Sequence, residues 1–145
     1  MFLGENKHNV DGKGRIVMPR AYREELAGDV VISQGRDRNL VVWKLSDWER
    51  EAERVRENTT DTRKGRAFRL TFFSTSEQQT VAANTGRIQL PAHLREFAGL
   101  DASAEAVVVG NFETVEIWNP GRYAEQKLLG EEVYLADEED EPDEE

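Results

Sequence analysis

An internal repeat constrains this chain more than any other feature. The eleven residues GRIVMPRAYRE at 14–24 align without a gap with GRIQLPAHLRE at 86–96, and six of the eleven are identical. Unrelated sequences agree at about one position in twenty at ordinary composition. The correspondence resumes further along, where Trp43 faces Trp118. The chain therefore contains the same half twice.

Each half opens with a Gly-rich polar turn that leads into a short strand. Such turns favour hairpins, so we expect strands at 15–18 and 87–90. Because side chains alternate along a strand, Arg15 and Arg87 point outward and the isoleucines that follow them point inward. The repeated arginines are therefore expected on an exposed face.

A short helix is expected after this strand in both halves. Pro19 and Pro91 suit the first helical turn, and Gly28 and Gly99 suit its end. Two further strands should follow in each half, separated by turn-forming residues. We expect them at 30–33 and 40–44 in the first half and at 106–110 and 114–118 in the second.

An outer helix is expected at the end of each half. The sequence SDWE is a capping-box start for a helix over 46–57, and residues 58–62 break it. Asn-Pro opens the equivalent helix over 119–129. Trp48 and Tyr123 are interpreted as packing residues, since aromatic side chains in amphipathic segments usually fill core.

Neither half is large enough to close a hydrophobic core alone. Each offers a few strands and one short inner helix in about 40 residues, so the two halves should intertwine. The chain divides into a first half with its outer helix, a connecting segment, a second half with its outer helix, and an acidic tail. These parts are assigned to 1–58, 59–76, 77–130 and 131–145.

The net charge of -10 is concentrated in the last residues. Residues 131–145 hold ten acidic side chains and no basic one, which leaves 19 of each sign in 1–130. We expect this tail to be mostly disordered, because it has few apolar groups to offset the entropy cost of ordering. Two roles stay open for it, solubility and competition with the phosphate groups of a partner for a basic patch.

Basic residues gather in two groups that form either local positive patches or ordinary solvated faces. The groups are Lys7, Lys13, Arg15, Arg20 and Arg23, and Arg63, Lys64, Arg66 and Arg69.

Enzyme chemistry finds no support in the sequence. The chain has no cysteine, and His8 and His93 have no partner at metal-ligand spacing, so we expect no metal site. Phosphate-loop and Gly-x-Ser-x-Gly motifs are missing. No cofactor or small-molecule substrate is expected. Without cysteines, a signal-peptide pattern or a membrane-length apolar run, the protein is expected to be cytoplasmic.

Four ordered segments resemble the MraZ family, a relative of the SpoVT/AbrB swapped-hairpin DNA-binding proteins. They are MFLGENKHNVDGKGRIVMPRAYREEL, RAFRLTFFS, NTGRIQLPAHLREFAGL and EIWNPGRY. The resemblance implies an α+β, mainly β fold, in which two tandem swapped-hairpin halves form one pseudo-dimeric β-barrel with peripheral helices. It also implies a homo-oligomeric ring, in agreement with the rule that head-to-tail contacts close or polymerise.

The resemblance further implies a nucleoid-associated transcriptional regulator with double-stranded DNA as its partner. The implied target is a set of short direct repeats upstream of the cell-division and cell-wall gene cluster that begins with the regulator's own gene. A module that binds another protein remains the alternative, because the composition is acidic.

In that family an Asp-x-x-x-Arg motif occurs once per half on a turn implied to face DNA. The first copy is intact from Asp11 to Arg15, whereas Ala83 replaces the aspartate in the second. Pairing of the two arginines with carboxylates on a barrel rim is the structural alternative. The candidate DNA contacts are Lys13, Arg15 and Arg87, with Lys7 and Arg20 as supporting phosphate contacts and Asp11, Gly14 and Gly86 as motif residues.

Overall fold

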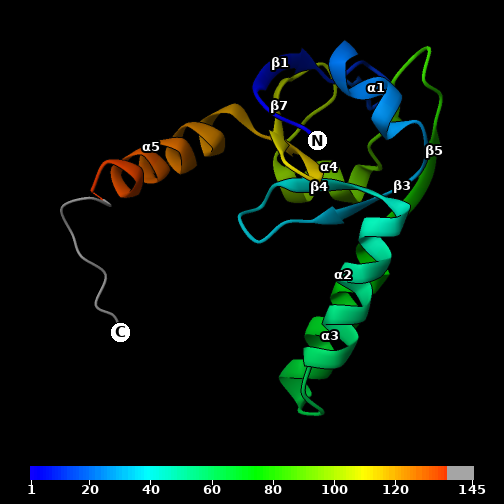
Figure 1. Ribbon diagram of the computed structural model, residues 1–145, viewed down its shortest axis with the longest axis vertical. Coiled ribbons are helices and arrows are strands. Elements are labelled where there is room, and N and C mark those ends of the chain that lie inside the picture. Colours follow the sequence, from blue (N-terminus) through cyan, green and yellow to red (C-terminus); the bar gives the residue numbers. More distant parts are fainter. Residues whose placement is uncertain (137–145) are drawn as a thin grey trace.

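The computed structural model describes residues 1–136 and shows a six-stranded antiparallel sheet, a separate two-stranded ribbon and helices around them (Figure 1). The expectations for the tail beyond residue 136 lie outside the described residues. The first half contains β1 (Glu5–Asn9), β2 (Arg15–Val17), α1 (Arg20–Leu26), β3 (Gly28–Gln34), β4 (Leu40–Lys44) and α2 (Leu45–Asn58). α3 (Arg63–Thr75) links it to the second half. That half contains β5 (Glu77–Val81), β6 (Arg87–Gln89), α4 (Ala92–Ala98), β7 (Glu105–Asn111), β8 (Thr114–Trp118) and α5 (Pro120–Ala136).

The duplication predicted from the sequence is visible in the order of elements, which is the same in both halves. β4 and β8 occupy the predicted residues, and β3 and β7 are longer than predicted by one or two residues at each end. Gly99 ends α4 in the left-handed conformation (φ +67°), as predicted. Gly28 does not end α1; that helix stops at Leu26, and Gly28 begins β3.

The two halves are interleaved through their first strands. The sheet order is β1-β7-β8-β4-β3-β5, so β1 of the first half pairs with β7 of the second, and β5 pairs with β3 in return. β2 and β6, the second strands of the two halves, pair with each other. A half of this size thus completes its sheet with a strand from its twin.

The hydrophobic core lies between the inner face of the sheet and a layer formed by α1, α4 and the ribbon. Ile16 and Ile88 of the ribbon are 1% and 0% exposed, and they share one core cluster with Val30 of β3 and Val108 of β7. The alternation predicted for the ribbon is confirmed, because its buried isoleucines lie between exposed or half-buried residues.

The predicted closed barrel is wrong, because the sheet stays open with β1 and β5 at its edges. β2 and β6 have three residues each and form ladder pairs only with one another within residues 1–136. Strands of this length are too short to pair also with the edge strands β1 and β5 and so close the barrel. The side-chain amide of Gln79 makes one substitute contact, accepting a hydrogen bond from the Gln89 N–H at 3.0 Å and donating to its carbonyl.

The connecting segment contains a helix that the sequence did not predict. α2 ends where expected, but α3 then runs back along it, and the two project from the sheet as a helical hairpin (Figure 1). Trp48 of α2 stacks on Phe72, with Phe73 edge-on at 5.9 Å between centroids. The packing role predicted for Trp48 is confirmed.

Two further expectations about the outer helices need correction. The capping box does not form, because α2 begins directly at Leu45 after β4 and has no side-chain cap. Asp47, within the expected box, is instead paired with Arg50 and Lys44. α5 continues to Ala136 rather than ending near 129, so it includes the first six residues assigned to the tail. None of the described helices is long and apolar enough to cross a membrane.

Candidate nucleic-acid interface

The β2–β6 ribbon carries polar side chains on its outer face. Its register pairs Arg15 with Gln89 and Val17 with Arg87, with the two buried isoleucines between them. Arg15 and Arg87 are therefore diagonal neighbours on the same face, about 7–8 Å apart in such a register. Arg87 and Gln89 are exposed, and the Arg15 side chain retains 32% exposure.

The first turn holds Arg15 in place through Asp11. One carboxylate oxygen of Asp11 accepts from the backbone N–H groups of Lys13 and Arg15, both at 2.9 Å. The other oxygen accepts from the Arg15 Nε at 2.9 Å. The backbone N–H of Asp11 donates to the Arg15 carbonyl at 2.8 Å, which closes the turn. The aspartate of the motif thus fixes both the turn and the guanidinium. Hydrogen bonds to its ionised carboxylate are charge-assisted and therefore strong.

These hydrogen bonds also keep Asp11 ionised. The backbone N–H of Arg15 contributes most, and with the Arg15 side chain and Lys13 it lowers the pKa of the Asp11 carboxyl below its ordinary value. A lowered carboxyl pKa means that this organisation is present at neutral pH and is lost only as pH falls through the folded-state value. Arg15 therefore stays oriented through the neutral and mildly acidic range.

The second turn lacks this device and has a different backbone pattern. The carbonyl of Ala82 accepts from both Thr85 and Gly86, so this turn starts one residue earlier than its counterpart. The Thr85 hydroxyl accepts from the Arg87 N–H at 3.4 Å. Within residues 1–136 the Arg87 guanidinium has no hydrogen-bond partner. The alternative that the two arginines pair with carboxylates therefore describes Arg15, which pairs with Asp11 of its own turn. It does not describe Arg87.

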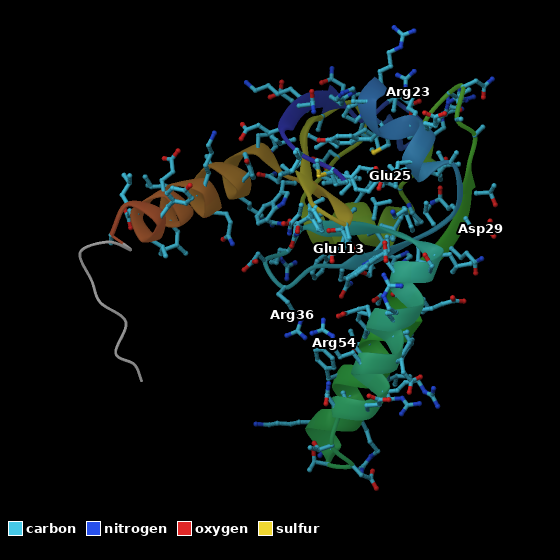
Figure 2. The ribbon with its side chains drawn as sticks, in the orientation of Figure 1. Arg23, Glu25, Asp29, Arg36, Arg54 and Glu113 are labelled. Atoms are coloured by element: carbon cyan, nitrogen blue, oxygen red, sulfur yellow. The ribbon has the colours of Figure 1, made fainter. Side chains whose placement is uncertain are left out.

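The two turns are held against the core by arginines of the opposite half. Arg23 of α1, near the top of Figure 2, donates to the Met18 carbonyl at 3.0 Å and lies beside Gly86. Arg95 of α4 donates to the Leu90 carbonyl at 3.2 Å and lies beside Gly14. The structural role expected for these helical arginines is confirmed, and it is reciprocal.

Both turn glycines have backbone conformations that other residues rarely adopt, with φ of +80° at Gly14 and +61° at Gly86. A Cβ on Gly86 would lie 2.5 Å from Cγ of Arg23, whereas one on Gly14 would meet the Arg95 guanidinium at 3.0 Å. Each substitution also incurs the left-handed backbone cost of about 1–2 kcal/mol.

We expect Gly86→Ala to lower the free energy of unfolding by at least about 1–2 kcal/mol and by more than Gly14→Ala does. The reason is that the closest atom beside Gly86 belongs to the stem of Arg23, not to its mobile end. Urea denaturation measures both changes. Arg23→Ala in the Gly86→Ala background should recover part of the loss, and equal losses for the two glycines would contradict this packing.

The structure brings some of the candidate residues together and separates others. Lys13 lies in the first turn, where Gln89 donates to its carbonyl at 2.9 Å, so Lys13, Arg15 and Arg87 share one surface. Arg20 is exposed at the start of α1, three residues after β2. Lys7 lies elsewhere, on the side of β1 that faces Tyr123 of α5.

The ribbon surface is positive despite the acidic composition of the whole chain. The segments 12–23 and 78–95, which contain both ribbon strands and the first turn of each following helix, include six Lys and Arg residues and no acidic one. Acidic residues flank them at Asp11, Glu24, Glu25, Glu77 and Glu96. The α2–α3 hairpin, over 45–75, has seven basic and six acidic residues, and four of its arginines are paired with carboxylates. Within these two segments the basic side chains are therefore less compensated than in the hairpin.

Gln79 and Gln89 also shape this surface, although no motif in the sequence assigns them a role. Gln89 crosses the ribbon to the Lys13 backbone, and Gln79 ties β6 to the sheet edge. For Gln89 the sequence did contain a signal, because alternation along the strand places it on the outer face beside Arg87. Gln79 had no such signal, since its contact depends on the interleaving of the halves. Among the described residues no cluster of three or more His, Asp or Glu side chains could hold a metal ion.

Comparisons with known proteins match almost the whole chain. One family matches over residues 1–70 and 74–139 and is described as "MraZ protein, putative antitoxin-like". A Salinispora tropica protein named transcriptional regulator MraZ is 37% identical over 141 residues, covering 97% of this chain and 92% of the relative. Proteins of the same name from Desulfitobacterium hafniense (strain Y51) and Thermomicrobium roseum are 37% and 40% identical. They cover 94% and 89% of this chain, and 93% and 89% of their own lengths.

Proposed function

The chain belongs to the MraZ family, and on this premise we propose that it is a transcriptional regulator that binds DNA in a sequence-specific manner. Relatives that share its full length are named transcriptional regulators. A regulatory role needs no catalytic site.

The exposed β2–β6 ribbon with its two arginines is the observation that carries the proposal. The major groove of B-form DNA is wide enough to admit a two-stranded ribbon. Arg15 and Arg87 point away from the core on the same face, so both can reach one groove. Arginine reads guanine through two parallel hydrogen bonds, and lysine contacts phosphate without sequence information.

Each basic residue of this surface takes a role that follows from its position. Arg15, oriented by Asp11, supplies the best-ordered contact, and Arg87 supplies a second, less constrained one. Lys13 and Arg20 contact phosphates at the turn and at the start of α1. Lys7 faces α5, so its phosphate contact is the least supported part of the set.

The resemblance to the family supports the finer parts of the proposal. The target is a set of short direct repeats upstream of the division and cell-wall gene cluster that includes the regulator's own gene, and the protein binds them as a ring of subunits. Two incomplete halves that share one core also fit the swapped-hairpin relationship, with the sheet left open. Several subunits of one ring can each bind one repeat of the array, so that weak single contacts give high overall affinity through avidity.

Two substitutions at the acidic position of the motif test whether its carboxylate strengthens DNA binding by orienting the arginine. Asp11→Asn keeps an oxygen for the two backbone N–H groups but cannot accept from Arg15 Nε, so we expect weaker DNA binding with an unchanged fold. Ala83→Asp restores the motif beside Arg87 and is expected to strengthen binding. Fluorescence anisotropy on a labelled repeat array measures both. Equal affinities for all three proteins would show that these carboxylates do not position a contact.

Electrophoretic mobility shift of the upstream repeats tests the function itself. We expect retardation of the repeat fragment that persists in excess unrelated DNA and weakens as salt increases. A fragment with scrambled repeats is the control. Equal retardation of both fragments, or of neither, would contradict sequence-specific binding.

A protein-binding module is the second candidate function. It is favoured by the second half of α5, where Leu128, Val133 and Leu135 are exposed. The mobility shift separates the two candidates, since a module of this kind leaves both DNA fragments unretarded.

A further inference from the structure

α5 is fixed to the body at its first half only. Asn119 accepts from the N–H groups of Gly121 and Arg122 at its start, and the Tyr123 hydroxyl and Lys127 ammonium donate to Glu5 at 2.7 and 3.0 Å. Burial, reinforced by Glu5, raises the pKa of Tyr123 to about 12, so this hydroxyl keeps its proton. The rest of the helix extends away from the sheet (Figure 1).

The extended half of α5 carries a cluster of exposed apolar side chains. Leu128, Leu129, Val133 and Leu135 are 60%, 56%, 63% and 75% exposed. The corresponding helix of the first half, α2, is covered by α3, and α3 has no counterpart after α5 in the described residues. An apolar helix surface of this kind marks an interaction site. Within residues 1–136, α5 therefore lacks the helical partner that its twin has.

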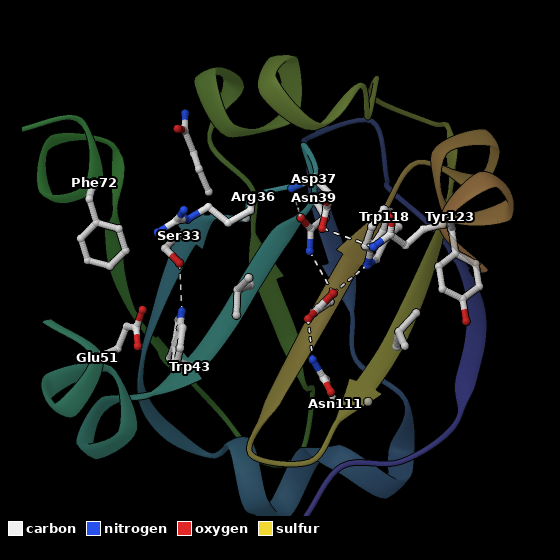
Figure 3. Close-up of a pocket in the computed structure, with 17 residues that line it drawn as sticks. Ser33, Arg36, Asp37, Asn39, Trp43, Glu51, Phe72, Asn111, Trp118 and Tyr123 are labelled. Carbon is white, nitrogen blue, oxygen red and sulfur yellow. Dashed lines mark hydrogen bonds between the residues drawn. The ribbon is translucent and has the colours of Figure 1, made fainter. Parts of the chain in front are cut away.

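A groove of complementary character lies beside the α2–α3 hairpin. A cavity of 440 Å³ on the outer face of the sheet is lined by Trp43, Arg36 and Phe72 (Figure 3). A second cavity continues from it along the hairpin, past Phe68, and shares Arg36 with the first. Arg36 and Arg54 both point into this angle between sheet and hairpin (Figure 2).

The charges of the helix and of the second cavity, along the hairpin, are opposite. Glu131 and Glu132 lie among the exposed leucines of α5, and no basic residue follows Lys127 in that helix. The groove contains Arg36, which lies over the Phe68 ring at 4.7 Å, together with Arg54 and Lys64. Glu51 is the one acidic residue that lines the second cavity, and it is paired with Arg54. The first cavity is also lined by Asp37, which accepts from Gln126, and by Glu116, which accepts from Asn39, Asn111 and Trp118.

We propose that the second half of α5 docks into the α2–α3 groove of a neighbouring copy of this chain. The first half of α5 lines the first cavity through Tyr123 and Gln126, but its second half and the hairpin project from the body in different directions, so that half does not reach the groove of its own molecule (Figure 1). In the neighbour, the leucines meet Phe68 and Phe72, and the glutamates meet basic side chains. The contact joins different surfaces on the two copies, so it propagates head to tail, as the ring of the proposed function requires. This inference rests on the oligomeric state in the proposed function and assigns its interface.

Two complementary variants test the head-to-tail contact. Leu128→Asp with Leu135→Asp removes the apolar surface of α5, and Arg36→Glu with Phe68→Ser alters the groove. We expect each double substitution to raise the dissociation constant for self-association at least about thirtyfold, as for central interface residues. Sedimentation velocity then finds monomers of either variant at concentrations where the wild type assembles. Leu70→Asp is the matched control, since this 69% exposed leucine of α3 lies outside the groove lining.

Mixing the two variants gives the decisive result. Each retains the surface that the other lacks, so the mixture should form heterodimers and nothing larger. Normal assembly of the groove variant, with only the α5 variant monomeric, would mean that α5 pairs with another α5 and would overturn the proposal. Normal assembly of both variants would overturn it as well.

Measuring the affinity of both variants for DNA distinguishes failure of the proposed interface from failure of the proposed function. Both variants keep the ribbon, so each should bind a single repeat as the wild type does while losing affinity for the array through lost avidity. Variants that assemble normally but bind DNA refute the interface alone. A wild type that assembles but binds no repeat refutes the function alone.

Discussion

Replacing Arg15 by alanine is expected to abolish binding to the repeat array at concentrations where the wild type saturates it. Loss of one good base or phosphate contact amounts to about 1–3 kcal/mol for a single site. The loss recurs in each subunit that contacts the array, so the effect is multiplied through avidity. Arg15 is the contact most sensitive to this change, because Asp11 already holds its guanidinium in place and little entropy is lost on binding.

Arg87→Ala is the matched comparison, with a smaller expected loss. Arg87 occupies the same place on the ribbon, but no carboxylate orients it and Thr85 stands where the first turn has Lys13. Anisotropy titrations at fixed salt should therefore rank the proteins as wild type, Arg87→Ala and Arg15→Ala, from tight to weak. Circular dichroism serves as the folding control. A loss for Arg87→Ala that exceeds the loss for Arg15→Ala would contradict the role given to Asp11.

Ile88→Ala is expected to have the largest effect on stability, lowering the free energy of unfolding by about 2–5 kcal/mol. Ile88 is fully buried at the centre of the ribbon, directly opposite Ile16 of the other half. Its removal leaves a cavity where the two halves meet, and the short β6 strand has few other contacts with which to close it. Urea denaturation at one protein concentration measures the change, since assembly makes stability depend on concentration.

Val17→Ala is the control for this cavity, because Val17 lies on the same ribbon but is 36% exposed. It should change the free energy of unfolding by no more than about 0.5 kcal/mol. Combining Ile88→Ala with Ile16→Ala should show a coupling of about 0.5–3 kcal/mol, as expected for residues in contact. Independent, additive losses would mean that the two isoleucines do not pack together.

The sequence predicted the elements whose signals are local. Alternation and turn residues placed β4 and β8 at their observed bounds, and the repeat placed Arg15 and Arg87 at matching positions on one face. Gly99 ended its helix as expected because a left-handed residue terminates a helix wherever it occurs. Gly28 failed the same expectation, because the chain leaves α1 in an extended conformation and enters β3 at once.

The parts that sequence reasoning missed depend on contacts between distant segments. β1 has the polar sequence ENKHN, and its place beside β7 follows from the interleaving of the halves. α3 has no buried residue and is held by aromatic contacts with α2, so it lacks the apolar stripe that marks a core helix. The barrel was expected from the family resemblance, and the three-residue ribbon strands do not close the sheet.

Photo-crosslinking from single positions tests the central claim, that the outer face of the ribbon contacts DNA. A benzophenone amino acid at Val17 lies on that face, and the same amino acid at Leu70 lies on α3, the helix with the second group of basic residues. We expect crosslinks to the repeat DNA from position 17 and none from position 70. Crosslinks from position 70 alone, or from both positions equally, would contradict it.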